Sequence, residues 1–154
     1  MEILTISEKE TEILGSKIAS QLKNGDLILL EGELASGKTF LARSIGKALG
    51  VPEREITSPT FAIMQEYFGS MKLIHGDLYR LDSWEACENL GIYDYFSQDG
   101  VVILEWAKRF EEFLPEEFLV ISIKGTEESG RIFDFSPYGI GWKMRIEEWE
   151  KILF

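Results

Sequence analysis

Residues 32–39 read Gly-Glu-Leu-Ala-Ser-Gly-Lys-Thr, and this stretch decides the fold because it matches the pattern G-x-x-x-x-G-K-[ST] in full. The pattern indicates a phosphate-binding loop where a strand precedes it and a helix follows, since both are needed to aim main-chain N–H groups at one anion. Residues 26–31 form an apolar run typical of a buried strand, and residues 40–49 carry apolar side chains at helical spacing before Gly50. We therefore predict that the chain binds a nucleoside triphosphate.

Each fixed position of the loop has a chemical role. Gly32 and Gly37 let the main chain turn and approach phosphate where a side chain would collide. Lys38 would reach the β- and γ-phosphates, and the hydroxyl of Thr39 would ligate the Mg²⁺ that bridges their oxygens. Main-chain N–H groups of residues 35–39 would donate to the phosphates. The predicted nucleotide-binding residues of this segment are Gly32, Glu33, Leu34, Ala35, Ser36, Gly37, Lys38, Thr39 and Phe40.

Length and composition predict one globular domain over residues 1–154, with 45% hydrophobic and 28% charged residues. No run approaches 18 apolar residues and no signal segment opens the chain, so we expect a cytoplasmic protein without a membrane contact. A single cysteine, Cys87, excludes an internal disulfide and a cysteine-based metal cluster. Sixteen basic and 27 acidic residues give a net charge of −11, which disfavours direct nucleic-acid binding and suits a basic protein partner.

The rest of the sequence predicts an α/β fold with a mixed sheet. Ser7 and Glu10 match a capping box ahead of a helix that runs to residue 24. Strands are expected over residues 61–68 and 72–75, joined by a tight hairpin turn at Gly69-Ser70. A helix over residues 83–90 and buried strands over 101–104 and 118–123 follow, whereas 132–135 alternates less cleanly and 143–154 fits either a helix or a strand plus helix. We predict a P-loop three-layer sandwich whose sheet includes an antiparallel hairpin.

Hydrolysis or transfer also needs a carboxylate near Mg²⁺ and a group that orients the attacking species. Glu105 follows the buried strand 101–104, where the carboxyl end of a strand meets the ligand crevice, and Asp77 follows the strand that ends at His75. Thr60 is a candidate switch residue, because a hydroxyl on the loop after the first crossover can reach the γ-phosphate. We interpret His75 as a packed strand-end residue rather than a base.

Taken in order, the motifs resemble one family, TsaE (YjeE), the small P-loop ATPase of bacterial tRNA threonylcarbamoyladenosine synthesis. The resemblance spans most of the chain and is carried by short segments rather than by composition. After the phosphate loop these are Ser-Pro-Thr-Phe at 58–61, His-Gly-Asp-Leu-Tyr-Arg at 75–80, Leu-Gly-Ile-Tyr-Asp-Tyr-Phe at 90–96 and Leu-Glu-Trp at 104–106.

The resemblance implies roles for matching residues. Thr39 and Glu105 would hold Mg²⁺, Asp77 would position water or metal, and Thr60 would be the switch threonine. Arg131 would lie near the nucleotide, and Trp106 beside the metal. One position departs from the family pattern, because Ala35 stands where the family usually has glycine. If this position has a positive φ, alanine costs about 1 kcal/mol there.

The same resemblance implies a Mg-dependent ATPase that is nearly idle alone and is stimulated by the TsaD and TsaB proteins, so that it acts on tRNA only through them. Two other functions stay open. A small-metabolite kinase would need an acceptor site and an arginine-bearing lid, and a non-catalytic subunit would only sense ATP. A GTPase is disfavoured, because the sequence has no Asn-Lys-x-Asp segment to read guanine.

Overall fold

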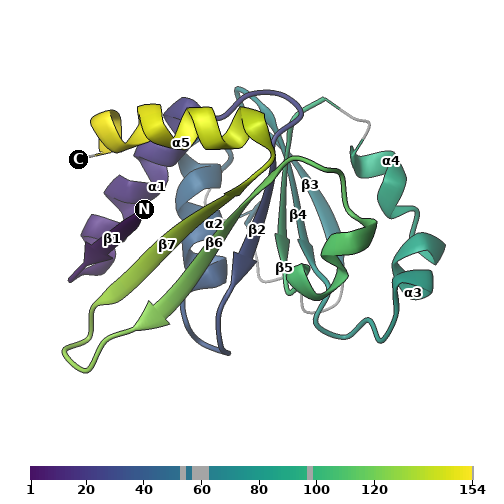
Figure 1. Cartoon of the computed structure of the whole chain (residues 1–154), viewed down its shortest axis with the longest axis horizontal. Helices are drawn as coiled ribbons and strands as arrows, with labels where there is room; N and C mark the ends of the chain where they lie inside the picture. Colours follow the sequence, from purple (N-terminus) through teal and green to yellow (C-terminus); the bar gives the residue numbers. More distant parts are fainter. Residues whose placement is uncertain (53–54, 57–62, 97–98, 154) are drawn as a thin grey trace.

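Parallel strands form the centre of the sheet. In the computed structural model, which describes residues 1–52, 55–56, 63–96 and 99–153, β2 (Leu27–Glu31) lies between β5 (Val101–Glu105) and β6 (Phe118–Gly125) and is parallel to both. On the far side of β5, β4 (Lys72–Asp77) also pairs in parallel. Across the described residues the strand order is β1-β7-β6-β2-β5-β4-β3 (Figure 1).

Antiparallel strands form both edges, which confirms the predicted mixed sheet. On one side β7 (Arg131–Tyr138) pairs with β6 and the short β1 (Glu2–Thr5) pairs with β7; on the other, β3 (Met64–Phe68) pairs with β4. Strand β1 was missed by the sequence analysis, and β7 is longer than the stretch 132–135 that alternated poorly.

The predicted β3–β4 hairpin is confirmed, with Gly69 and Ser70 in the turn. Phe68 pairs with Lys72, so the connection has three residues, 69–71. The main-chain N–H and the hydroxyl of Ser70 both donate to the carbonyl of Leu49, at 2.6 and 2.9 Å, and the backbone of Gly69 lies against the same carbonyl. A contact with the end of the preceding helix therefore shapes this turn, and local sequence rules do not include such a contact.

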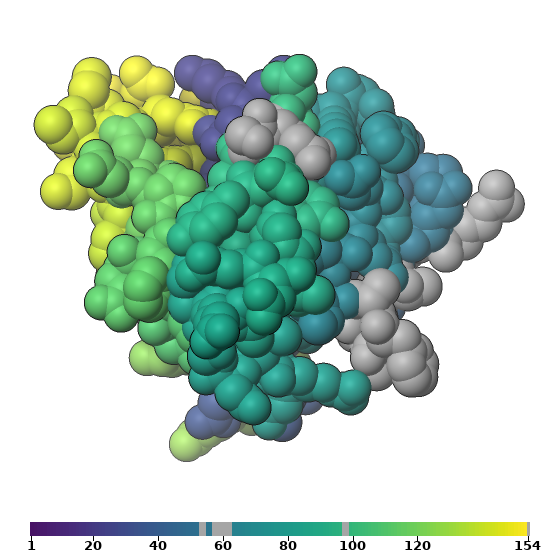
Figure 2. All heavy atoms as spheres, turned by 90° about the vertical axis from the view of Figure 1, so that its right-hand side faces the viewer, coloured from purple at the N-terminus to yellow at the C-terminus, as the bar shows by residue number. Residues whose placement is uncertain are grey.

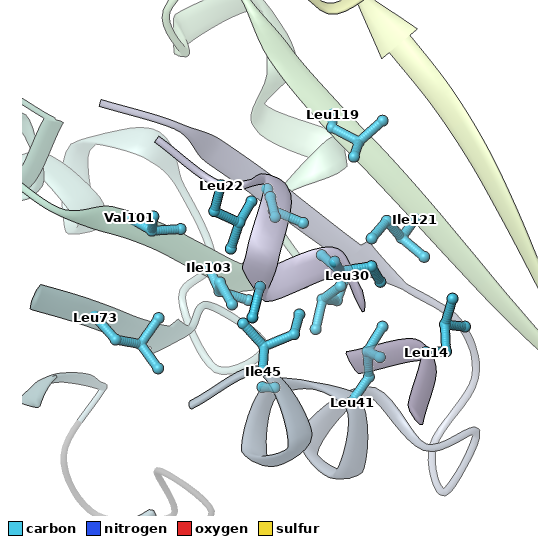
Figure 3. Close-up of a cluster of buried hydrophobic side chains, with 14 of the residues drawn as sticks. Leu14, Leu22, Leu30, Leu41, Ile45, Leu73, Val101, Ile103, Leu119 and Ile121 are labelled. Carbon is cyan, nitrogen blue, oxygen red and sulfur yellow. The ribbon is translucent and has the colours of Figure 1, made fainter. Parts of the chain in front are cut away.

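One face of the sheet is covered by α1 (Glu8–Gln21), α2 (Lys38–Ala48) and α5 (Ile140–Leu153) (Figure 1). Helix α1 begins as predicted, because the Ser7 hydroxyl accepts from the N–H of Glu10. The tail that the sequence left open is helical, and it buries Trp142, Ile146, Trp149 and Leu153. Figure 3 shows this core, in which Leu41 and Ile45 of α2 meet Leu30 of β2.

The other face of the sheet is covered by α3 (Trp84–Asn89), α4 (Ile92–Phe96) and a 3₁₀ helix, η2 (Lys108–Phe113). Figure 2 shows the segments that contain α3 and α4 at the front of the molecule. Ile28 and Leu30 of β2 belong to the first core, and Leu27 and Leu29 to the second, as alternation along a strand requires. The predicted α/β architecture with helices on both faces is confirmed. No helix in the described ranges is both long and apolar enough to cross a membrane.

Candidate functional site: the phosphate loop and the strand ends beside it

The loop between β2 and α2 has the backbone that phosphate binding requires. Gly37 has a φ of 108° and directly precedes the first residue of α2, so the N-terminus of the helix opens onto the loop. A Cβ on Gly32, which has a φ of 151°, would lie 2.5 Å from the Ser36 hydroxyl oxygen and 2.6 Å from the carbonyl oxygen of Ile123. Both predicted glycines are therefore needed by the geometry.

Ala35 has a φ of 62°, in the left-handed region. The position where the chain departs from the family pattern is thus one where a residue with a Cβ is strained, by about 1–2 kcal/mol. Ala35 therefore has the positive φ at which alanine is costly, and the loop holds this strain.

Lys38 is buried within the loop. Its ammonium donates to the carbonyl oxygens of Gly32 and Glu33, at 2.7 and 2.9 Å, and lies 4.4 Å from the centre of the Trp106 ring. Burial lowers the pKa of Lys38, while the negative charges of Glu105 and two further carboxylates oppose the shift. The Lys38 ammonium therefore lies buried at the loop, with acidic groups around it.

Thr39 and Glu105 lie side by side, as predicted from the loop pattern and the strand end. The Thr39 hydroxyl donates to the Glu105 carboxylate, with oxygen–oxygen distances of 3.3 and 3.2 Å. Glu105 is the last residue of β5 and is buried, and its Oε2 lies 2.7 Å from Nε2 of His75, whose side chain is 1% exposed. His75 is a packed residue, as interpreted from the sequence, but its contact with Glu105 was not foreseen.

Asp77 ends β4 and faces Glu105 in the strand register. Its Oδ1 accepts from the N–H of Tyr79 at 2.9 Å. Burial raises the pKa of Asp77, and the nearby charge of Glu105 acts in the same direction, whereas the N–H of Tyr79 opposes it. The two predicted carboxylates are thus brought together at the carboxyl ends of adjacent parallel strands.

Cavities adjoin the loop on more than one side. A cavity of about 640 Å³ is lined by residues 31–36, residues 122–125 of β6 and Arg131. Two smaller cavities border the residues at the start of α2. One, of about 270 Å³, is lined by residues 34–40 together with Asp77, Glu105 and Trp106. The second, of about 330 Å³, shares Gly37 and Phe40 with the first and continues between the start of α1 and β7. Arg131 lines this second cavity, and its Nε donates to the carbonyl of Ser36 at 3.0 Å. Thr60, the predicted switch residue, lies outside the described residues.

The donor set beside the loop suits a hard divalent cation. A hydroxyl and a carboxylate, from Thr39 and Glu105, present oxygen atoms at one spot, and oxygen ligands are those that Mg²⁺ prefers. No group of three or more His, Cys, Asp or Glu side chains within the described residues could hold a metal ion by itself. An ion at this position would therefore complete its coordination with phosphate oxygens and water.

Two contacts near the site had no signal in the sequence. The Nη2 atom of Arg109 donates to the carbonyls of Leu78 and Leu81, both at 2.6 Å, and so fixes the segment that follows Asp77. The carboxylate of Glu31 accepts from the N–H of Lys108 at 2.7 Å and ties the start of the phosphate loop to the segment after β5. Both join residues more than 25 positions apart, and neither residue belongs to a recognised pattern.

Comparison with known proteins supports the motif-based resemblance. The family model "Threonylcarbamoyl adenosine biosynthesis protein TsaE" matches residues 5–133. The chain is 38% identical over 145 residues to the tRNA threonylcarbamoyladenosine biosynthesis protein TsaE of Bacillus subtilis, covering 94% of this chain and 90% of that protein, and 34% identical to the TsaE of Treponema pallidum, covering 85% and 96%.

A solved structure is also similar. The crystal structure of YdiB from Bacillus subtilis superposes with a TM-score of 0.81 and 34% sequence identity, over 98% of this chain and 94% of YdiB. The likeness in fold thus agrees with what the sequence comparisons find. The chain belongs to the TsaE family of tRNA threonylcarbamoyladenosine biosynthesis proteins.

Proposed function

We propose that this protein binds and hydrolyses ATP as a subunit required for threonylcarbamoyladenosine modification of tRNA, acting with the TsaD and TsaB proteins. The observation that carries the proposal is the contact between Thr39 of the phosphate loop and Glu105 at the end of the neighbouring strand. A loop alone would bind phosphate, whereas a hydroxyl beside a buried carboxylate provides the protein's share of a Mg²⁺ site, as nucleotide hydrolysis needs.

We assign the two parts of the nucleotide to the two smaller cavities beside the loop. The triphosphate would bind in the cavity lined by the loop, Asp77 and Glu105, where main-chain N–H groups at the start of α2 and the Lys38 ammonium face it. The base and ribose would bind in the adjoining cavity between α1 and β7, which Gly37, Phe40 and Arg131 line. Together the cavities have the volume of an ordinary small-ligand site.

For hydrolysis, the paired strand ends supply distinct groups. Mg²⁺ bound at Thr39 and Glu105 would neutralise charge on the transferred phosphoryl group. His75 holds Glu105 by a buried hydrogen bond, which limits the rotation of the carboxylate. Asp77 lies next to Glu105, and burial raises its pKa, which favours Asp77 as a group that orients an attacking water.

The charge of the chain supports a role through protein partners. With a net charge of −11, the chain as a whole repels tRNA, so contact with tRNA would be indirect, through TsaD and TsaB. Because hydrolysis by many small P-loop proteins depends on a group supplied by a partner, we expect low activity from the isolated chain. The compartment that suits this role is the cytoplasm.

The test is phosphate release from ATP and Mg²⁺ by the protein alone and after adding TsaB and TsaD of the same organism, with Lys38→Ala as the control. Stimulation by the partners that Lys38→Ala abolishes would support the proposal. ATP binding without turnover, even with both partners, would instead indicate a nucleotide-sensing subunit. High activity without partners, together with a phosphorylated small-molecule acceptor, would indicate a kinase.

A further inference from the structure

The segment that follows β5 is held against the end of β2 by two hydrogen bonds. The N–H of Trp106 donates to the carbonyl of Leu30 at 3.4 Å, and the N–H of Lys108 donates to Oε1 of Glu31 at 2.7 Å. Trp106 has a φ of 61°, an uncommon conformation for a bulky side chain that needs support from its surroundings. The 2.7 Å bond to Glu31 is the shorter of the two and the one made by a side chain.

The turn places an aromatic ring in the nucleotide site. The Trp106 ring lies 4.4 Å from the Lys38 ammonium, at cation–π distance, and 4.9 Å from the ring of Tyr79. Trp106 also lines the cavity assigned to the triphosphate. The position of this ring therefore restricts the Lys38 side chain, and the position of the ring depends on the turn.

We propose that Glu31 is a positioning residue of the nucleotide site, whose carboxylate fixes the turn at residues 106–108 so that the Trp106 ring is held over Lys38. Glu31 itself does not line the triphosphate cavity. Its carboxylate is half-buried and accepts from the N–H of Lys108. Because this donor is a main-chain group, holding the turn requires an acceptor at this place, whereas the negative charge of Glu31 acts separately on Lys38.

Three substitutions separate the acceptor from the charge. Glu31→Gln keeps an oxygen acceptor of the same length and removes the charge. Glu31→Asp keeps the charge and draws the carboxylate back by one methylene from the N–H of Lys108. Glu31→Ala removes both. If the acceptor matters, Glu31→Gln holds the Trp106 ring as the wild type does, and Glu31→Asp and Glu31→Ala both displace it.

The direct readout is ¹⁹F NMR of protein labelled with 5-fluorotryptophan and free of nucleotide. The chain has four tryptophans, and Trp84, Trp142 and Trp149 are buried, so their resonances report whether each variant keeps the fold. Trp106→Phe assigns the fourth resonance. We expect Glu31→Ala and Glu31→Asp to shift or broaden the Trp106 resonance and leave the other three in place, while Glu31→Gln leaves all four unchanged.

The second readout, binding of a non-hydrolysable ATP analogue, rests on the proposed function. We expect about threefold weaker binding for Glu31→Ala than for Glu31→Gln, since both variants lack the charge that acts on Lys38 and only Glu31→Ala also loses the cation–π contact. A Trp106 resonance that stays in place in Glu31→Ala overturns the inference. The inference also fails if Glu31→Gln shifts this resonance as Glu31→Ala does while Glu31→Asp leaves it in place. If the wild type binds no nucleotide, the proposed function fails, but the NMR result still decides the role of Glu31.

Discussion

Replacing Ala35 with glycine removes a defined strain from the phosphate loop. The φ of 62° at Ala35 costs a residue with a Cβ about 1–2 kcal/mol, and glycine adopts this conformation without that cost. Glycine in turn gives the unfolded chain extra freedom, worth about 0.4–1 kcal/mol. The net expectation is a gain of about 1 kcal/mol in the free energy of unfolding, or about 2–4 °C in melting temperature for a chain of this size.

Urea denaturation of Ala35→Gly beside the wild type measures this gain. The matched control is Gly25→Ala, because Gly25 has a φ of 93° and a Cβ built there meets nothing within 4 Å. Gly25→Ala introduces the same kind of backbone strain that Ala35→Gly removes, at a position outside the loop where the added Cβ collides with nothing. We expect it to lower the free energy of unfolding by about 1 kcal/mol.

The affinity for ATP tests whether this strain is also present in the nucleotide-bound protein. We expect the loop to keep the left-handed conformation of Ala35 in the free and in the bound protein, so that the strain cancels in the dissociation constant. We expect Ala35→Gly to change the dissociation constant by less than about twofold, since equal strain in both states has no differential effect. Tenfold tighter binding with unchanged stability would show that the strain arises only on binding, and the reasoning above would be wrong.

Three further outcomes follow from the packing and the charges. His75→Ala leaves Glu105 buried without its partner and should lower the free energy of unfolding by about 3 kcal/mol, whereas a loss below about 1 kcal/mol in urea denaturation would show that water replaces the imidazole. Asp77→Asn should raise the stability at pH 7, because the raised pKa of Asp77 means that its ionised form costs stability above the folded-state pKa. That gain should shrink as the pH falls toward 3.8, and a gain independent of pH would contradict the burial of this charge. Gly69→Ala should lose about 1–3 kcal/mol by thermal denaturation, since its Cβ would lie 2.1 Å from the carbonyl oxygen of Leu49; unchanged stability would show that the turn relaxes freely.

The centre of the fold could be predicted because local signals and long-range contacts agree there. The buried strand, the glycines of the loop and the helical spacing of residues 40–49 each point to the same strand–loop–helix unit, and the structure confirms it. Glu105 could be placed for a similar reason, because the end of a buried parallel strand meets the ligand crevice whatever the rest of the chain does.

The edge of the sheet at β1 could not be predicted, because it depends on a partner distant in the sequence. Strand β1 has four residues and is defined by pairing with β7, about 130 positions later. Helix α5 is a different case: Trp142, Ile146, Trp149 and Leu153 recur at helical spacing, so a closer count of the periodicity could have found it. The contact between His75 and Glu105 needs the parallel register of β4 and β5, which single-sequence patterns do not provide.

Strain and buried charge have different consequences when a ligand binds, and one experiment separates them. The strain at Ala35 is in the backbone, and we expect it to be the same with and without a bound anion, whereas the cost of burying Asp77 depends on the charges beside it. At 100 times the dissociation constant, ATP with Mg²⁺ stabilises a folded protein by about 2.7 kcal/mol. The gain from Ala35→Gly should therefore add in full to this ligand stabilisation in thermal denaturation. Asp77→Asn should instead be more stable than the wild type without ligand and gain less from ATP and Mg²⁺, because the variant lacks the carboxylate next to the metal site. If ATP and Mg²⁺ stabilise Asp77→Asn by as much as the wild type, Asp77 does not contribute to nucleotide binding. Only the role of orienting water then remains for it.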